Sequence, residues 1–429
     1  MGILIKNGKI LVNGELVKRD LLIEDDKISK IAEIIVEDGH KEIDVKGKFV
    51  SAGFIDMHVH LREPGFEAKE TIATGLAAAA RGGFTAIASM PNTRPITDSV
   101  EVVEYIKEKT KREGVVRVLP IASITVRELG DRLTDMAALK RAGIVGVSDD
   151  GVGVQSAKVM KEAMKLAKSL ELPVIAHCEE DTLVKGGIVH EGVFAEKHGL
   201  KGIPNESEAI HVARDILLAE ATGVHYHICH ISTEQSIRHV RYAKELGLPV
   251  TTEVCPHHLI LTDEDIPGLD ANYKMNPPLR SPKDRESLLA ALKDGTIDII
   301  VTDHAPHTEE EKKKGMELAP FGIVGLETAF PLLYTHLVLT GDFTLQEIID
   351  KMTRKPAELF GLPWGKVEEG SIADLVVVDL ETQREVNPSE FASKGKNTPF
   401  KGWKLQGWPV MTMVAGSIVW KREEVIKTI

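Results

Sequence analysis

Two histidines at the end of a short apolar run are the first residues in this sequence whose types and spacing could do chemistry. His58 and His60 close the run FIDMHVH, which begins at Phe54. Residues i and i+2 of a β-strand point to the same side, so the two imidazoles converge. Imidazole is a common ligand of zinc, and we interpret the pair as metal ligands rather than as buried core histidines.

Three further apolar runs end in a single group of a metal-ligating type. His177 follows PVIA, His230 follows HYHIC and Asp303 follows DIIVT. With His58 and His60, these residues place five ligand-type groups at four strand ends. Burial alone does not require such an arrangement at one mouth of a parallel barrel. The spacing therefore predicts a metal centre.

The elements that must position these groups form a repeating pattern. From about residue 53 to residue 361, short apolar runs alternate with longer amphipathic segments, as in repeated βα units. Eight runs can be counted, and they begin at Phe54, Phe84, Val115, Gly143, Pro173, Val224, Pro249 and Ile297. Eight strands in about 310 residues predict an α/β fold with a closed (β/α)₈ barrel, whose active sites lie at the carboxyl ends of the strands. A doubly wound open sheet is the alternative.

Both ends of the chain read as β-hairpins. The segments ILIKNGKILVNGELV, DLLIEDDKISKIAE, SIADLVVVDL and VMTMVAGSIVWK alternate apolar and polar residues, with Asn-Gly and Asp-Asp turn signals. Neither end has enough strands to bury a sheet face alone. We therefore expect one small, discontinuous β-domain made of residues 1–52 and 366–429, beside a catalytic barrel at residues 53–365.

Composition excludes several classes of partner. The chain has 429 residues, with 53 Lys and Arg against 65 Asp and Glu, and a net charge of −12. Such a surface lacks the positive charge that nucleic acids require. No run approaches about 18 apolar residues, and the first residues are charged where a signal peptide is apolar, so we expect a cytoplasmic protein without a membrane partner. The three cysteines lie in apolar runs and read as buried, reduced thiols.

Taken together, the motifs resemble the amidohydrolase superfamily and, within it, the bacterial type I dihydroorotases. The resemblance covers nearly the whole chain, and the motifs that carry it, between residues 53 and 307, are GFIDMHVHLREPG, MPNT, SDDG, AHCE, HICHIS, KMNPPLR and TDHAPH. The combination of HVHLREPG with KMNPPLR and TDHAPH is highly specific. The resemblance implies a zinc enzyme that reversibly cyclises N-carbamoyl-L-aspartate to L-dihydroorotate plus water, the third step of de novo pyrimidine (UMP) biosynthesis.

The resemblance also implies a ligand set. By the family pattern two zinc ions would be held, one by His58, His60 and Asp303 and the other by His177 and His230, with Asp150 shared. Many relatives bridge their metals with a carbamylated lysine on the fourth strand, but GIVGVSDDG contains no lysine. Asp150 is the substitute we expect, and because it is shorter than that lysine, occupancy by one or by two ions stays open. Asp149 competes for the role but should point to the opposite side.

Catalysis and substrate binding are assigned from the same resemblance. Asp303 would move the proton between the attacking water and the ring nitrogen that leaves on ring opening. The substrate carries a carboxylate, and the guanidinium of Arg62 suits bidentate carboxylate binding. A turn-forming role stays open for the two asparagines of the set. The implied substrate contacts are His60, Arg62, Asn92, Asn276, His307 and the backbone near Phe321 and Gly322.

The remaining histidines receive structural interpretations. His225 and His227 form a second H-x-H pair, which we place on the opposite face of its run from His230 and interpret as packing residues. His257 and His258 follow a proline after the seventh run, and we expect them to support ligands rather than to bind metal. Five histidines in helical or loop segments are expected at the surface, namely His190, His198, His211, His239 and His336.

Other functions and features stay open at this point. A hydantoinase, dihydropyrimidinase or allantoinase would open similar cyclic amides, but those substrates lack the carboxylate that Arg62 suits. A metal-free structural relative would have lost ligands that are present here. The segment from His307 to Gly322 is either a solvated loop or a lid over the site. The resemblance leaves open a homodimer and an association with aspartate transcarbamoylase.

Overall fold

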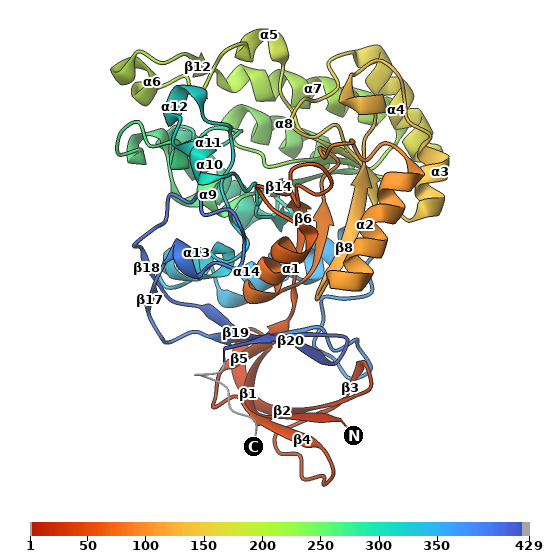
Figure 1. Ribbon diagram of the computed structural model, residues 1–429, viewed down its shortest axis with the longest axis vertical. Helices are drawn as coiled ribbons and strands as arrows, with labels where there is room; N and C mark the ends of the chain where they lie inside the picture. Colours follow the sequence, from red (N-terminus) through yellow and green to blue (C-terminus); the bar gives the residue numbers. More distant parts are fainter. Residues whose placement is uncertain (1, 423–429) are drawn as a thin grey trace.

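The computed structural model describes residues 2–422, and their core is an eight-stranded parallel sheet rolled into a barrel (Figure 1). Each strand lies within one of the eight apolar runs that were counted in the sequence. The predicted α/β barrel is therefore confirmed, and the open doubly wound sheet is wrong. The strands are β6 (Phe54–Val59), β7 (Phe84–Ser89), β8 (Arg117–Ala122), β9 (Gly146–Val147), β10 (Val174–Ala176), β13 (Tyr226–Ile228), β14 (Val250–Val254) and β15 (Ile299–Ile300).

Amphipathic helices cover the outside of the barrel. In α4, the buried residues Met160, Ala163, Met164 and Ala167 recur at helical spacing and face the strands. No helix within residues 2–422 is long and apolar enough to cross a membrane. The longer helices are α1 (Ile72–Arg81), α2 (Val100–Glu113), α3 (Met136–Ala142), α4 (Ala157–Ser169), α7 (Asn205–Thr222), α8 (Glu234–Glu245), α10 (Pro282–Asp294) and α14 (Leu345–Met352).

Several of these helices begin at a residue whose side chain caps the first turn. The side chains of Thr71, Ser156, Thr233 and Ser281 each accept a hydrogen bond from a backbone N–H of the first turn. Short elements fill the connections. They are η1 (Val126–Glu128), α5 (Asp181–Val184), β11 (Val189–His190), α6 (Val193–His198), β12 (Gly202–Ile203), α9 (Pro256–Ile260), η2 (Asp263–Asp265), η3 (Ala271–Tyr273), α11 (Glu309–Lys312), α12 (Gly315–Leu318), α13 (Ala329–Leu333), η4 (Tyr334–Val338), α15 (Arg354–Leu359), β17 (Arg384–Glu385), η5 (Pro388–Glu390) and β18 (Lys404–Leu405).

The barrel closes between its first and last strands with few backbone contacts. A single parallel bridge joins Val59 to His304, and the backbone N–H of His60 donates to the His304 carbonyl at 2.9 Å. Deeper in the barrel, the carboxylate of Asp56 accepts hydrogen bonds from the backbone N–H of Thr302 at 3.1 Å and from its hydroxyl at 2.6 Å. Burial raises the pKa of Asp56 to about 7. Side-chain hydrogen bonds thus complete the seam of the barrel.

A second sheet combines both ends of the chain and lies below the barrel in Figure 1. β16 pairs antiparallel with β5, and this pairing joins the two ends. The predicted small β-domain built from both termini is confirmed, while its boundaries at residues 52 and 366 stay predictions. The strands of the sheet are β1 (Ile3–Val12), β2 (Glu15–Glu24), β3 (Lys27–Ala32), β4 (Lys41–Asp44), β5 (Phe49–Ala52), β16 (Leu375–Asp379), β19 (Trp408–Val414) and β20 (Ser417–Lys421).

Only one of the two N-terminal Asn-Gly pairs forms a turn. Asn13 and Gly14 connect β1 to β2 with φ angles of 52° and 85°, the left-handed backbone that a two-residue hairpin requires. Asn7, in contrast, lies inside β1 with a φ of 58°, where the pairing with β2 shifts register between Ile5 and Gly8. The same dipeptide therefore makes a bulge within the strand and a turn at its end.

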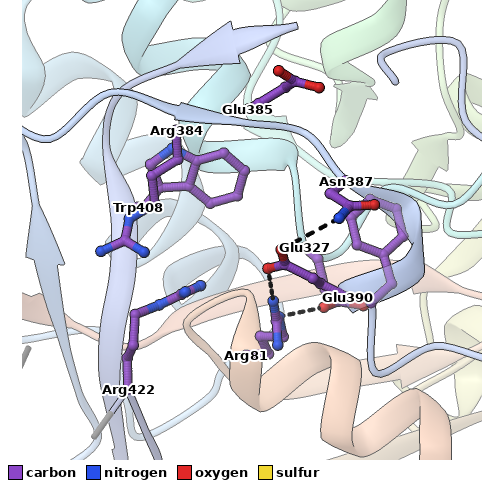
Figure 2. Close-up of a pocket in the computed structure, with 9 residues that line it drawn as sticks. Arg81, Glu327, Arg384, Glu385, Asn387, Glu390, Trp408 and Arg422 are labelled. Carbon is purple, nitrogen blue, oxygen red and sulfur yellow. Dashed lines mark hydrogen bonds and ion pairs between the residues drawn. The ribbon is translucent and has the colours of Figure 1, made fainter. Parts of the chain in front are cut away.

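Residues 384–405 leave the small sheet and run along the barrel, and we call this segment the C-terminal strap. Glu327, which follows the last barrel strand, accepts hydrogen bonds from the backbone N–H groups of Ala392 at 3.1 Å and Ser393 at 3.2 Å. Figure 2 shows Arg81 of α1 between Glu327, at 2.8 Å, and Glu390 of the strap, at 3.4 Å. The strap is thereby attached to the barrel.

Candidate active site

Six side chains of metal-ligating types meet at the carboxyl ends of the barrel strands. They come from β6 and from the segments that follow β6, β9, β10, β13 and β15. None of these side chains is more than 9% exposed. The structure thus brings together all six residues that the sequence predicted for a metal centre, which are His58, His60, Asp150, His177, His230 and Asp303.

The first part of this cluster joins two histidines to two carboxylates. Asp303 Oδ1 lies 3.1 Å from His60 Nε2 and 3.6 Å from His58 Nε2. Asp150 presents Oδ1 to His58 Nε2 and Oδ2 to His60 Nε2, each at 3.5 Å. Both carboxylates therefore face the same two imidazoles, as the i and i+2 spacing in β6 requires.

The second part of the cluster shares Asp150 with the first. His177 Nδ1 lies 3.0 Å from His230 Nε2, and these nitrogens are 3.8 Å and 3.9 Å from Asp150 Oδ1. His230 and Asp303 have φ angles of 27° and 48°, so the chain turns sharply where it leaves β13 and β15. These strained turns, at the ends of two strands, are common at functional sites.

The donor set fits a divalent metal. Four buried atoms in the cluster have no hydrogen-bond partner within the described residues, namely His58 Nε2, Asp150 Oδ1, His177 Nε2 and His230 Nδ1. A buried polar atom without a partner costs about 1–3 kcal/mol, so four in one place indicate a missing ligand. Ligand atoms of His58, His230 and Asp303 lie within 4.8 Å of one another, as do those of Asp150, His177 and His230. Nitrogen and oxygen donors of these kinds suit zinc.

The electrostatics of the cluster keep both carboxylates ionised. Burial alone would raise the pKa of Asp150, but the neighbouring His58 and His60 outweigh it and hold that pKa well below its usual value. The same balance of burial against His58 and His60 lowers the pKa of Asp303. Burial, assisted by the charge of His177, lowers the pKa of His230 to about 3. His230 is therefore a neutral imidazole, the form that binds metal.

Asp149 faces away from the cluster. Its Oδ1 accepts hydrogen bonds from the backbone N–H of Ile124 at 2.7 Å and of Thr125 at 3.0 Å, and its Oδ2 accepts from the Thr125 hydroxyl. This carboxylate therefore shapes the loop that follows β8. Of the two neighbouring aspartates, Asp150 is the one that points into the mouth of the barrel.

Arg62 and His307 lie together at the rim of the cluster. Arg62 Nε donates to the Pro306 carbonyl at 3.2 Å, and Arg62 Nη2 lies 3.3 Å from His307 Nε2. His307 Nε2 donates to the Phe321 carbonyl at 2.8 Å, which fixes the tautomer of its ring. Burial lowers the pKa of His307, and the charge of Arg62 adds to that effect. The positive charge at this rim therefore lies on the Arg62 guanidinium and on the Lys69 ammonium, which is 3.3 Å from His307 Nδ1, and not on His307.

The two predicted asparagines have different surroundings. Asn92 Oδ1 accepts from His60 Nδ1 at 2.8 Å, and Asn92 Nδ2 donates to Asp150 Oδ2 at 3.2 Å, so this residue orients two members of the cluster. Asn276 Nδ2 donates to Glu179 Oε2 at 2.8 Å, while its buried Oδ1 has no partner within the described residues. Asn276, Glu179 and Phe321 line one pocket of about 410 Å³.

The segment from His307 to Gly322 is folded, although most of its charged side chains are exposed, and its role as a lid stays a prediction. It contains α11 and α12, and Thr308 caps α11. Lys312 is 7% exposed, and its ammonium donates to three backbone carbonyls at 2.9–3.2 Å. At Gly322, φ is 131° and a Cβ atom would lie 2.7 Å from that of Ala305, so only glycine fits.

Comparison with known proteins identifies the family. A model described as Dihydro-orotase-like matches residues 47–236. A curated dihydroorotase of Halalkalibacterium halodurans is 60% identical over 428 residues and covers 100% of both chains. The chain belongs to the dihydroorotase family. Another curated member, from Geobacillus sp. strain WCH70, is 59% identical and covers 98% of this chain and 99% of its own.

Solved structures with the same fold include hydantoinases. An L-hydantoinase from Arthrobacter aurescens superimposes with a TM-score of 0.89 at 27% identity, covering 98% of this chain and 96% of its own. A D-hydantoinase from Thermus sp. has a TM-score of 0.83 at 28% identity, covering 97% and 94%. Dihydroorotases are metal-dependent enzymes that act on a cyclic amide, and the described residues hold candidate metal-binding clusters.

Glu253 of β14 is a member of this site that the sequence interpretation missed. It is fully buried, and its carboxylate accepts hydrogen bonds from His58 Nδ1 at 2.7 Å, from His227 Nε2 at 3.0 Å and from the backbone N–H of His230 at 3.2 Å. Burial would raise its pKa, but His58 and His227 lower it to about 2. Such a carboxylate fixes the tautomer and orientation of a metal-binding imidazole.

A sequence signal for Glu253 exists, because it is the single charged residue in the apolar run PVTTEVC. The expectation that His227 and His230 lie on opposite faces of their run is wrong, since the His227 side chain reaches Glu253 inside the barrel and the His230 side chain lies against His58 and His177 in the same interior. His227 also packs against Phe360, with ring centroids 5.2 Å apart. His227 therefore has a hydrogen-bonding role in addition to the packing role that was expected.

Two histidines that were expected at the surface are buried. His190 is 7% exposed and His211 is 1% exposed. His211 Nδ1 donates to the Glu179 carbonyl at 2.9 Å, because α7 turns this side toward the barrel. His258 is also buried, and its Nε2 donates to the Pro277 carbonyl at 2.9 Å. The three cysteines are buried and free, as predicted.

Proposed function

We propose that this chain is a zinc-dependent dihydroorotase with two ions per subunit, which reversibly cyclises N-carbamoyl-L-aspartate to L-dihydroorotate in pyrimidine biosynthesis. One observation carries the proposal. In a chain 60% identical to a curated dihydroorotase, the guanidinium of Arg62 lies at the rim of a buried His and Asp cluster. The names of the structural neighbours favour a hydantoinase as the second candidate.

The metal would be held by the six residues of the cluster. His58, His60 and Asp303 would hold one ion, and His177 and His230 the other, with Asp150 shared between them. When bound, the ions supply Lewis acidity that polarises the carbonyl under attack and makes water a nucleophile at neutral pH. Glu253 and Asn92 orient the imidazoles of His58 and His60 toward the ions.

Asp303 moves the proton. In ring opening its carboxylate accepts a proton from the attacking water and delivers it to the ring nitrogen as the carbon–nitrogen bond breaks. In cyclisation the same transfers run in reverse. Burial opposes the ionised form of Asp303, and the ion that His58 and His60 would help to hold supplies positive charge that would keep this carboxylate ionised before the attack, as a general base must be.

The substrate contacts distribute polar groups around the ring. Arg62, with Asn92 and His307, would bind the free carboxylate, since a guanidinium matches a carboxylate bidentately. The buried Asn276 Oδ1 would accept a hydrogen bond from an amide N–H of the ring. The backbone near Phe321 and Gly322 would also bind the ring amides. A neutral cyclic amide would leave the Arg62 charge without a partner, and this penalty separates dihydroorotate from hydantoins.

The deciding experiment is an ultraviolet assay of dihydroorotate hydrolysis, run beside hydantoin, dihydrouracil and allantoin, with the metal content measured on the same sample. We expect turnover of dihydroorotate that is lost on chelation and restored by zinc, with two ions bound per subunit. Turnover of the neutral cyclic amides alone would assign the chain to the hydantoinases. A fully metallated sample that turns over none of the four would contradict both functions.

Localisation and assembly complete the proposal and rest on the sequence and the resemblance. We propose a cytoplasmic enzyme, and the resemblance leaves a homodimer and an association with aspartate transcarbamoylase open. Size-exclusion chromatography with light scattering, without and with added aspartate transcarbamoylase, tests both assemblies. A monomeric mass in both runs would contradict them.

A further inference from the structure

Asn397 of the C-terminal strap is buried beneath the two loops that carry proposed substrate contacts. It is 4% exposed. Its Oδ1 accepts a hydrogen bond from the backbone N–H of His307 at 3.0 Å. Its Nδ2 donates to the carbonyl of Ala305 at 3.1 Å and to that of Gly322 at 3.0 Å. The carbonyl and both N–H groups of one side-chain amide thus hold the two loops together.

The backbone around Asn397 continues the same contact. Its own carbonyl accepts from the backbone N–H of Val324 at 2.9 Å, and the N–H of Ala305 donates to the Ile323 carbonyl at 2.8 Å. The two loops also contact each other directly, because His307 Nε2 donates to the Phe321 carbonyl. Asn397 therefore sets the separation between residues 305–307 and residues 321–324, the two segments that face the substrate.

The strap is fixed to the barrel next to Asn397. Glu70, which is fully buried, accepts from the backbone N–H of Lys394 at 3.0 Å and from the hydroxyl of Ser393. At Gly395 a Cβ atom would lie 2.6 Å from the Cβ of Pro306, so the strap approaches the loop as closely as a backbone can. On the other side of the strap, Glu327 and Arg81 attach it to α1 (Figure 2). The amide is thus presented from a fixed support.

We propose that Asn397 is a positioning residue for substrate binding, supplied by the C-terminal strap. It holds the His307 backbone and Gly322 at the separation that the substrate carboxylate and ring require. This inference rests on the proposed function of His307 and Gly322. The four hydrogen bonds of Asn397 each join the strap to one of the two loops, and none of them involves the metal cluster. The effect of Asn397 therefore falls on substrate binding rather than on the chemical step.

The chemistry of the side chain explains why asparagine is needed. Two of its partners are carbonyl oxygens and one is an N–H group, so the side chain must donate twice and accept once. Aspartate has the same shape but donates to neither carbonyl, and its charge would face both oxygens. Asn397→Asp therefore changes the hydrogen bonds without leaving a cavity.

The test compares Asn397→Asp with Asn387→Ala. Asn387 lies on the same strap but is exposed, and its side chain forms hydrogen bonds with Ser389 and with Glu390, which Figure 2 shows beside it. For Asn397→Asp we expect the KM for dihydroorotate to rise about tenfold or more, because buried backbone groups lose their partners. We expect kcat to change less than about threefold, at unchanged zinc content. Asn387→Ala should match the parent protein.

Hydrogen exchange provides a second readout that does not depend on activity. In Asn397→Asp, the amides of Ala305, His307 and residues 321–324 should exchange faster, while the barrel strands keep their protection. A parent-like KM together with parent-like exchange would overturn the inference. A joint loss of protection, zinc and kcat would also overturn it, since that pattern marks a structural role. If Asn397→Asp does not fold, Asn397→Ser is measured against the same criteria. If the parent does not turn over dihydroorotate, the proposed function fails, and hydrogen exchange alone decides the positioning role.

Discussion

Asp303 stands where a buried strand end, two imidazoles and a strained backbone coincide. Asp303→Asn keeps the shape of the side chain but cannot accept a proton. We expect turnover to fall at least about a thousandfold, with the folded state retained. Steady-state kinetics with dihydroorotate and circular dichroism check this result. Asp131→Asn, at an exposed position, serves as the control, and near-normal turnover of Asp303→Asn would refute the proton-transfer role.

We propose that Arg62 determines which cyclic amide binds. Its guanidinium is held by the Pro306 carbonyl beside His307, so removing it leaves the substrate carboxylate without its charged partner. For Arg62→Ala we expect the KM for dihydroorotate to rise about 10- to 100-fold, with a smaller change in kcat. Michaelis kinetics against the exposed control Arg141→Ala test this expectation. An unchanged KM would remove the reason for preferring a substrate with a carboxylate.

Glu253 has its effect through His58. Because its carboxylate accepts the Nδ1 proton of His58, it leaves Nε2 as the atom that faces Asp150 and Asp303. For Glu253→Gln we expect a loss of zinc affinity of about 10- to 100-fold, measured by competition with a chelator. Glu245→Gln at the exposed end of α8 should bind zinc like the parent. Equal affinities in both variants would show that His58 needs no such partner.

At this scale the sequence predicted the groups that carry their own chemical signature. An imidazole or a carboxylate at the end of an apolar run is recognisable, and the structure brings His58, His177 and Asp303 together as expected. Glu253 and Asn397 escaped because their roles depend on partners that lie far away in the sequence, such as His58 and His307. A hydrogen-bonding role of this kind is defined by the folded backbone and not by residue type.

Among the helices and strands, too, the sequence predicted what a local pattern signals and missed what depends on distant residues. All eight barrel strands were predicted, yet β9 and β15 have only two residues each, because the chain turns into the site soon after they begin. The turn at Asp303 has a φ of 48° but no marker in the sequence, because the glycine that usually signals a positive φ is not present at this position. The strap escaped for the same reason as Asn397, because its anchors, such as Glu70 and Glu327, lie far away in the sequence.

The α11 segment offers a test that depends on pH. Burial lowers the pKa of Lys312 to about 7, whereas an unfolded chain keeps the lysine protonated up to about pH 10. Between these values the unfolded state binds more protons, so this residue makes the folded protein more stable as the pH rises from about 7 to about 10. Lys312→Met should lose that slope in a plot of Tm against pH.

The control for this prediction is Lys313→Met. Lys313 neighbours Lys312 but is exposed and paired with Glu309, and its pKa is raised by that partner. Thermal unfolding is followed for the parent and both variants between about pH 7 and pH 9.5. Parallel curves for the parent and Lys312→Met would mean that the buried ammonium does not titrate in this range.

At the scale of the whole molecule, the barrel and the small sheet share a core. Val376 and Val378 of β16 are fully buried in the cluster that contains barrel residues, and the hydroxyl of Thr412 donates to the Ala80 carbonyl of α1 at 2.6 Å. We therefore expect the two parts to unfold together. Tryptophan fluorescence, dominated by the strap and small-sheet residues Trp403, Trp408 and Trp420, should give the same midpoint as circular dichroism of the barrel helices. Two separate midpoints would contradict a shared core.

The contacts at the seam of the barrel make a complete set of metal ligands depend on the native register of the closing strands. Strands β6 and β15 meet through one backbone bridge, so the ladder itself hardly fixes how far one strand slides past the other. A slip of one residue would turn Asp303 away from His60 and disconnect Asp56 from Thr302. A barrel that closed in the wrong strand register would lack a complete set of metal ligands. We therefore expect that zinc, the proposed metal, would bind correctly closed molecules in preference, and that its presence during refolding would raise the yield of barrels with the native register.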